Sequence, residues 1–266
     1  VARPRPNTYA EPTQGAASVA MIVSEKPKIL TLDVGANGYY TYEVMDTCRP
    51  SPDFETGDPD LSLLSYLDCA EHAFIEYKKK VGEVDYQEFF DMLSFHTPFG
   101  GLVKGVHRTM MRKFKKAPPA AIEEDFKKRV EPSFQYCQEV GNIYGATVFL
   151  ATIGHILNAT FDRAKRLGIF SYGSGCCSEF YSAIADQTSQ DTLRQMQIGE
   201  RLAGRYEVSI EEYDQLLVYN QELLMGTENK VLDFAPLSHV YQNHFEGRKL
   251  LVLNRINNFH REYAWT

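Results

Sequence analysis

The sequence predicts a fold of the α/β class, in which apolar strands alternate with helices. Three observations support this prediction. An apolar run at 89–95 is typical of a buried strand, and a basic helix-like segment at 102–114 follows it after Pro98 and two glycines. The almost uncharged segment 148–157 is apolar all round, as a buried helix is. Residues 169–183 predict two strands joined by a turn rich in Gly and Ser.

The composition is that of an ordinary soluble globular protein. The 266 residues carry a formal net charge of −7, and 44% of them are apolar. This acidic balance argues against general nucleic-acid binding, and no apolar run approaches the roughly 20 residues that span a bilayer. The five cysteines form no Cys-x-x-Cys pair, so we expect neither a disulfide framework nor a metal site. The sequence therefore predicts a cytoplasmic protein whose partners are neither nucleic acid nor membrane.

The first third of the chain predicts two strands, a loop and a helix. Residues 15–23 are small and apolar, which is typical of a buried strand, and the alternation at 28–33 predicts the next strand. Residues 34–60 are rich in Tyr, Asp, Pro and Gly and are expected to form a long ordered loop. Apolar residues at helical spacing predict a helix over 61–80, with Asp60 as its N-cap.

Further elements follow from periodicity and from the residues that break it. They are helices at 120–130, 134–140, 192–202 and 210–224, the end of a helix at 166–168, and a terminal strand at 249–253.

His96 is the first candidate functional residue, because it stands where the strand at 93–95 ends. In open α/β sheets, ligands bind at the carboxyl ends of strands. A histidine there can be neutral at working pH and can give or take a proton. The alternative is a histidine that is simply packed in a strand-to-helix turn.

The basic helix supplies the second candidate site. Lys104, Arg108 and Arg112 are spaced by four residues and therefore share one helix face. An ordinary solvated face would look the same. Because the chain is otherwise acidic and His96 lies one turn earlier, we interpret the face as a site for an anionic partner. That partner is either a phosphate-bearing cofactor or an acidic carrier protein.

Two further stretches carry polar groups next to buried elements. Asn142 precedes the buried helix, either as its N-cap or as a side-chain donor at its mouth. The Gly-Ser-Gly turn at 173–175 lets backbone N–H groups approach a ligand closely, as in an oxyanion hole. We interpret Cys176 and Cys177 as strand-packing residues and not as a nucleophile. His260 is expected at the surface.

Five collinear motifs now point to one family. They are Phe95-His96-Thr97-Pro98-Phe99 for Phe-His-Ser-Pro-Tyr, Gly141-Asn142-Ile143-Tyr144 for Gly-Asn-Met-Tyr, Phe170-Ser171-Tyr172-Gly173-Ser174-Gly175 for Phe-Ser-Tyr-Gly-Ser-Gly, Asp46-Thr47-Cys48-Arg49-Pro50 for Asp-Phe-Tyr-Lys-Pro, and Pro12-Thr13-Gln14-Gly15 for Pro-Thr-Gly-Gly. Over its whole length the chain resembles the hydroxymethylglutaryl (HMG)-CoA synthase family of the thiolase superfamily.

The resemblance implies the layered α-β-α-β-α architecture of thiolases. Residues 1–33 would be the last strands of the first half, 34–82 a family-specific loop and helix, and 83–266 the second half. The implied reaction acetylates a cysteine, removes a proton from the acetyl methyl with a glutamate, and adds the carbanion to the ketone of a β-ketoacyl thioester.

The resemblance also implies the roles of individual residues. His96 polarises the ketone as the catalytic residue of this half. The residues implied in substrate binding are Asn142, Tyr144, Gly173 and Ser174.

This sequence departs from the family pattern in two places. The family's cysteine and glutamate lie upstream of the Pro-Thr-Gly-Gly motif, so we expect this chain to hold the histidine part of the site and a further N-terminal half to carry the rest. Family members that use CoA have a lysine where this chain has Gly101. With Lys104, Arg108 and Arg112 further along the helix, the resemblance favours donor and acceptor acyl carrier proteins.

We therefore expect β-branching in polyketide biosynthesis, with thioesters on phosphopantetheine arms, no bound cofactor, no metal and a homodimer. Two alternatives stay open. One is another condensing enzyme of the thiolase superfamily, such as a ketoacyl or chalcone-type synthase. The other is a non-catalytic subunit that binds acyl thioesters.

Overall fold

The computed structural model describes residues 6–8, 10–51 and 54–266. The chain divides into two compact units. The larger comprises Val1–Pro50 and Phe54–Glu200, and the smaller comprises Ser51–Asp53 and Arg201–Thr266. All the residues predicted to form the site lie in the larger unit.

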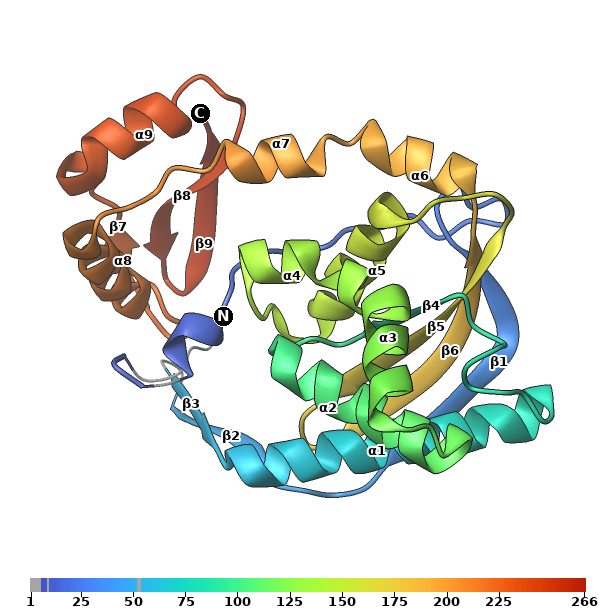
Figure 1. Ribbon diagram of the computed structural model, residues 1–266. Helices are drawn as coiled ribbons and strands as arrows, with labels where there is room; N and C mark the ends of the chain where they lie inside the picture. The colour runs from blue at the N-terminus through green and yellow to red at the C-terminus, as the bar shows by residue number, and fades with distance from the viewer. Residues whose placement is uncertain (1–5, 9, 52–53) are drawn as a thin grey trace. The chain divides into compact units, whose positions relative to one another are not determined.

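A mixed four-stranded sheet forms the centre of the larger unit (Figure 1), in the order β1 (Thr31–Thr41), β6 (Cys177–Ala185), β5 (Lys165–Gly173) and β4 (Met92–Phe95). β5 and β6 form an antiparallel hairpin, β1 is antiparallel to β6, and β4 is parallel to β5. The predicted strand–turn–strand unit is therefore confirmed.

The helix end predicted at 166–168 is wrong, because these residues lie inside β5. The reason is visible at Gly168. A Cβ there would come within 2.9–3.0 Å of the side chains of Leu93, Phe180 and Phe90. Gly168 is thus a strand residue that leaves room for core side chains, and it does not terminate a helix.

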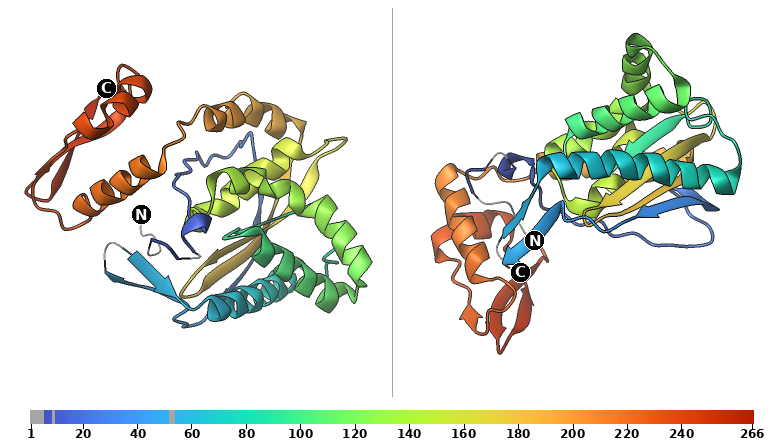
Figure 2. Two further views of the ribbon diagram at one scale, coloured as in Figure 1. Left: turned by 60° about the vertical axis from the view of Figure 1, so that its left-hand side comes forward. Right: turned by 90° about the horizontal axis from the view of Figure 1, so that it is seen from below.

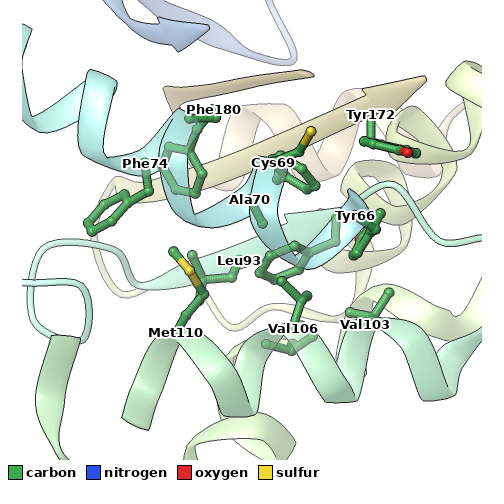
Figure 3. Close-up of a cluster of buried hydrophobic side chains, with 14 of the residues drawn as sticks. Tyr66, Cys69, Ala70, Phe74, Leu93, Val103, Val106, Met110, Tyr172 and Phe180 are labelled. Carbon is green, nitrogen blue, oxygen red and sulfur yellow. The ribbon is translucent and has the colours of Figure 1, made fainter. Parts of the chain in front are cut away.

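Helices cover both faces of the sheet, which confirms the α/β class. One face packs against α1 (Pro59–Val81) and α2 (Gly100–Met110), and Figure 3 shows their side chains interleaved with Leu93, Tyr172 and Phe180 from the strands. The other face packs against α5 (Thr147–Asn158) and α6 (Gln187–Arg194) through a second apolar cluster. The right-hand view of Figure 2 shows α1 running along the sheet.

The strand predicted at 15–23 does not form, and most of its side chains are exposed; Ile22 and Val23 are 94% and 88% exposed. A strand needs a neighbour for its backbone hydrogen bonds. The described residues offer this run only the bridge between Gln14 and Asn142 and the bond from Gly15 N to Asn142 O.

The segment predicted as a loop at 34–60 is mostly strand. β1 begins at Thr31 and continues to Thr41, and it is followed by a small hairpin of β2 (Thr47–Ser51) and β3 (Phe54–Gly57). At Gly38 a Cβ would lie only 2.1 Å from the backbone N of Tyr77 in α1. The glycine is there because the strand backbone touches the helix backbone.

The predicted helices of the larger unit are confirmed with shifted ends. The N-cap of α1 is Asp58, whose carboxylate accepts from the N–H groups of Asp60 and Leu61 at 3.0 Å each. The remaining helical segments are η1 (Glu11–Thr13), the π-helical η2 (Met111–Lys115), α3 (Pro119–Arg129), η3 (Glu131–Phe134), α4 (Gln135–Val140) and η4 (Tyr144–Ala146).

The smaller unit contains a three-stranded antiparallel sheet of β7 (Lys230–Val231), β8 (Leu251–Asn257) and β9 (His260–Trp265). Its helical segments are α8 (Ile210–Glu222), η5 (Ala235–Leu237) and α9 (Ser238–His244). The helix predicted at 192–202 is interrupted into α6 and α7 (Ile198–Ala203), with Gln197 at a φ of 52° between them. The strand predicted at 249–253 begins two residues later, and His260 is exposed as predicted.

Candidate active site and cationic groove

His96 stands directly after β4, as the sequence predicts. Its backbone N–H donates to the carbonyl of Phe170 on β5 at 2.8 Å, and its carbonyl accepts from the hydroxyl of Tyr66 on α1 at 2.6 Å. The residue is only 6% exposed, and its ring stacks on that of Tyr172 with centroids 6.2 Å apart. Two neighbouring elements thus fix the backbone, and an aromatic ring fixes the imidazole.

Burial controls the protonation of His96. Loss of solvation lowers its pKa to about 4, although a hydrogen bond to the backbone of Tyr144 opposes the shift. The Nδ1 atom is buried and has no hydrogen-bond partner among the described residues. Such an atom is uncommon in a folded protein and is available to a ligand. The imidazole is therefore neutral at physiological pH, with one ring nitrogen as hydrogen-bond donor and the other as acceptor, and Nδ1 serves as either one depending on the tautomer.

Asn142 shapes the turn that contains Tyr144, whose backbone contacts the His96 imidazole. Its Oδ1 accepts from the backbone N–H of Tyr144 at 2.9 Å and from the hydroxyl of Thr147 at 3.3 Å. Its oxygen thus closes the turn before α5, but Asn142 is not the N-cap of that helix, which is Ala146; the interpretation as a side-chain donor stays a prediction. With the oxygen engaged, the Nδ2 donor has no hydrogen-bond partner among the described residues.

Tyr144 connects His96 to the small β2–β3 hairpin. Its backbone has a positive φ of 58°, and it is the backbone of Tyr144 that contacts the imidazole. Burial and a hydrogen bond with Glu55 on β3 raise the pKa of its phenol. The phenol is thus held as a neutral group against Glu55.

The Gly-Ser-Gly turn is the connection between β5 and β6, where Gly173 and Ser174 are exposed. The turn is anchored by Asp46, which is fully buried and accepts from the N–H of Gly175 at 3.0 Å. Asp46 also accepts from the hydroxyl of Tyr172 at 2.9 Å. Since the Tyr172 ring stacks on His96, Asp46 joins the turn to the histidine.

Sequence reasoning quoted Asp46 only as part of a motif and missed this role. A third donor, the hydroxyl of Ser62, lies 3.2 Å from Asp46. The only signal in the sequence was an acidic residue in the Asp-Thr-Cys-Arg-Pro motif.

The buried cysteines serve packing. Cys69 on α1 and Cys176 bring their Sγ atoms to 3.4 Å, and burial raises the pKa of Cys69 to about 12. Burial likewise raises the pKa of Cys137 to about 11. Thiols with such pKa values are poor nucleophiles. The packing interpretation is right for Cys176, whereas Cys177 is exposed at the start of β6.

The predicted cationic face lines a cavity of about 170 Å³ between α2 and α3, which we call the α2–α3 groove. Its lining residues are Lys104, Arg108, Arg112, Pro119, Ile122, Glu123 and Phe126. Lys113 and Lys115, which extend the basic stretch in the sequence, pair instead with Glu71 and with Asp85. The spacing thus identified the three cations that share a surface.

A buried ionic cluster holds α3 against α2. Arg129 donates to both carboxylate oxygens of Asp125 and to the carbonyls of Tyr86 and Phe90. The Nε2 atom of His107 on α2 lies 2.9 Å from Asp125. Burial alone would raise the pKa of Asp125, but His107 and Arg129 hold it well below its usual range. This cluster therefore sets the width of the α2–α3 groove.

Within the described ranges, no helix combines the length and the apolar character needed to cross a bilayer. The same residues contain no group of three or more His, Cys, Asp or Glu side chains placed to hold a metal ion.

Comparison with known proteins gives consistent matches. Residues 107–263 match the model of the family described as "Hydroxymethylglutaryl-coenzyme A synthase C terminal". The chain is 52% identical over 258 residues to the "Polyketide biosynthesis 3-hydroxy-3-methylglutaryl-ACP synthase PksG" of Bacillus subtilis, covering 97% of this chain and 61% of the relative. It is 33% identical to the hydroxymethylglutaryl-CoA synthase of Enterococcus faecalis over 78% of this chain and 53% of that protein.

The solved structures that match this chain are also HMG synthases. The structure of PksG superposes with a TM-score of 0.93 at 51% identity and covers all of this chain and 65% of PksG. The HMG synthase of the curacin biosynthetic pathway, solved in complex with apo donor-ACP, has a TM-score of 0.88 at 54% identity over 91% of this chain and 60% of that chain. The chain thus spans about three fifths of the length of these relatives.

Proposed function

The chain belongs to the hydroxymethylglutaryl-CoA synthase family, and from this premise we propose that it forms the histidine part of a condensing site. The reaction joins an acetyl thioester to a β-ketoacyl thioester and yields a hydroxymethylglutaryl-type thioester. The cysteine that carries the acetyl group and the glutamate that deprotonates it belong, in this proposal, to the part of the enzyme outside this sequence.

The observation that carries the proposal is the buried, neutral His96 with an unpartnered ring nitrogen. When the acetyl carbanion attacks the ketone, negative charge develops on the ketone oxygen. In the tautomer whose proton is on Nδ1, the neutral imidazole donates a hydrogen bond to that oxygen, and the bond strengthens as the charge grows in a site from which water is excluded. Asn142 Nδ2 supports the same proposal as a second donor, suited to the carbonyl of an acyl group.

We further propose that both thioesters are carried by acyl carrier proteins on phosphopantetheine arms, as in β-branching of polyketides. The α2–α3 groove supports this, since carrier proteins are acidic and the groove gathers three cations. Gly101 supports it too, because the lysine of CoA users is absent there. PksG is named an ACP synthase, and the curacin enzyme was solved with its donor-ACP.

The first experiment tests the chemistry in the complete enzyme. We expect His96→Ala to abolish formation of the hydroxymethylglutaryl product, detected by mass spectrometry on the carrier, while acetylation of the enzyme cysteine continues. His260→Ala, which removes an exposed histidine, is the matched control. Condensation that persists in His96→Ala, or a ketoacyl or chalcone-type product, would contradict the proposal.

The second experiment tests the carrier. We expect acetyl-carrier protein to outperform acetyl-CoA as donor. The double variant Arg108→Glu/Arg112→Glu should raise KM for the carrier and leave the rate with a small pantetheine thioester nearly unchanged. Lys128→Glu reverses a charge on the exposed side of α3 and serves as control. Equal use of free CoA, or equal losses with both substrates, would argue against carrier recognition.

A further inference from the structure

The α2–α3 groove contains a single carboxylate among its cations. Glu123 on α3 places a carboxylate oxygen 2.8 Å from Nζ of Lys104. Arg108 and Arg112 line the same cavity and have no ion pair or side-chain hydrogen bond among the described residues. The groove therefore has one cation that is already neutralised and two that are not.

The pair between Lys104 and Glu123 is well suited to exchange. The two side chains are 50% and 44% exposed, and ion pairs at such exposure contribute little and are readily replaced. The hydrogen bond from Lys104 lowers the pKa of Glu123, so the carboxylate is ionised whenever the pair is formed. An incoming anion can replace Glu123 as the ion-pair partner of Lys104 without disturbing any buried group.

Lys104 keeps its place without Glu123. Its ammonium lies over the ring of Phe126 at 5.2 Å from the centroid, a favourable cation–π contact. Phe126 is itself buried, and the neighbouring Asp125 is anchored by Arg129. Removing the charge of Glu123 therefore leaves three positioned cations in the groove and an intact α3.

We propose that Glu123 is an internal counter-ion that competes with the carrier protein for the α2–α3 groove. In the free enzyme the Glu123 carboxylate forms an ion pair with Lys104. A bound carrier replaces it with one of its own acidic side chains, while Arg108 and Arg112 bind neighbouring negative charges. The inference rests on the proposed docking of a carrier protein at this groove, and it names the residue that sets how selective that docking is.

The consequence is a gain in specificity at some loss of affinity. A ligand with one negative charge can bind to an arginine but gains little by displacing Glu123, which is tethered nearby. A partner with several negative charges at the right spacing displaces it and uses all three cations. Discrimination between partners depends on such differences in affinity and not on the strength of binding itself.

The test measures binding without catalysis. The complete enzyme is titrated with the fluorescently labelled holo-carrier protein, and the variants are Glu123→Gln, the matched control Glu124→Gln and Arg112→Glu. Glu124 is the adjacent exposed carboxylate of α3 and lies outside the groove. We expect Glu123→Gln to tighten binding about threefold to fivefold at about 50 mM salt, with a smaller gain at about 500 mM, because salt screens exposed charges. Glu124→Gln should change affinity by less than about 1.5-fold at either salt.

The outcomes separate the two proposals. If Arg112→Glu weakens binding but Glu123→Gln behaves like Glu124→Gln or binds more weakly than the unchanged enzyme, the groove docks the carrier and Glu123 is not its competitor. If Arg112→Glu leaves binding unchanged, the groove is not the docking site, and both the carrier proposal and the role of Glu123 are wrong.

Discussion

The hydroxyl of Tyr66 is the side-chain group that fixes the backbone of His96, and Tyr66→Phe isolates its contribution. The hydroxyl donates to the His96 carbonyl at 2.6 Å, and both residues are buried. Removing it leaves a buried carbonyl without that partner, which costs about 1–3 kcal/mol. The aromatic ring stays, and it keeps its edge-to-face contacts with the rings of Phe170 and Tyr172, whose centroids each lie 5.3 Å from its own. The variant should therefore fold, with His96 less firmly held.

Misplacement of a catalytic group by about 1 Å can cost about 100-fold in rate. We expect Tyr66→Phe to slow condensation by about 10-fold to 100-fold and to leave acetylation of the enzyme cysteine within about twofold, because acetylation does not use the histidine in the proposed mechanism. Single-turnover assays of the two half-reactions measure both quantities.

Tyr77→Phe is the matched control for Tyr66→Phe. Tyr77 lies on the same helix, is equally buried and donates to the hydroxyl of Ser182 at 2.8 Å, on a different part of the sheet. It should lose comparable stability and keep its rate of condensation. Equal losses of rate in the two variants would refute the reasoning, since they would trace the effect to general destabilisation and not to the position of His96.

Three further predictions concern stability, measured by urea unfolding. Asp125→Asn should destabilise the larger unit by about 3–5 kcal/mol, because Arg129 loses its buried partner. Burial lowers the pKa of His155 to about 3 from an ordinary 6.5, so below pH 6.5 the unfolded chain binds a proton at this residue and the folded chain does not. The free energy of unfolding should therefore fall by about 2 kcal/mol between pH 7.5 and 5 because of His155. In His155→Gln the free energy of unfolding should fall less over the same interval. Gly38→Ala should lower the free energy of unfolding by at least about 3 kcal/mol, since the new Cβ would clash with the backbone of α1. Gly105→Ala, whose Cβ would meet nothing within 4 Å, should raise the free energy of unfolding by about 0.5–1 kcal/mol because alanine favours the helical conformation of α2.

The elements that could be predicted from the sequence are those that depend on residues close together along the chain. The β5–β6 hairpin pairs segments that follow one another, so its strands and turn were visible in the apolar pattern. The helix at 61–80 was visible because its apolar spacing and its cap are local. The run at 15–23 has the composition of a strand, but a strand needs a partner, and composition does not say whether one is present.

Glycine caused two of the errors in the predicted fold. Gly38 fell in the segment predicted as a loop and Gly168 was interpreted as the end of a helix, yet both lie inside strands where another element leaves no space for a Cβ. A glycine required by close packing and a glycine required by a turn look the same in a sequence.

The same distinction applies to the residues of the site: those in local patterns could be predicted, and those defined by contacts between distant segments could not. The sequence could predict His96 and the three cations of the groove, Lys104 and Arg108 of α2 and Arg112 of η2, because each belongs to a short pattern with its own chemistry. Asp46 could not be predicted, because it bonds to Gly175, 129 positions away. Glu123 was hidden for a related reason: it pairs with Lys104 across a groove between two helices, and nothing in the sequence of α3 distinguishes it from Glu124.

The placement of His96 and the α2–α3 groove on one segment has a mechanical consequence. Leu102, Val103 and Val106 bury one side of α2 in the core, so the helix cannot move relative to β4 without breaking that packing. The opposite side therefore holds Lys104 and Arg108 in fixed positions relative to β4, with Arg108 about 12 Å along α2 from its first residue at 1.5 Å per residue. In the proposed complex the carrier protein contacts the exposed side of α2, whereas His96 is buried, so the thioester reaches the histidine only on a long flexible arm. The proposal therefore predicts that recognition of the carrier and chemistry on its thioester can be altered independently.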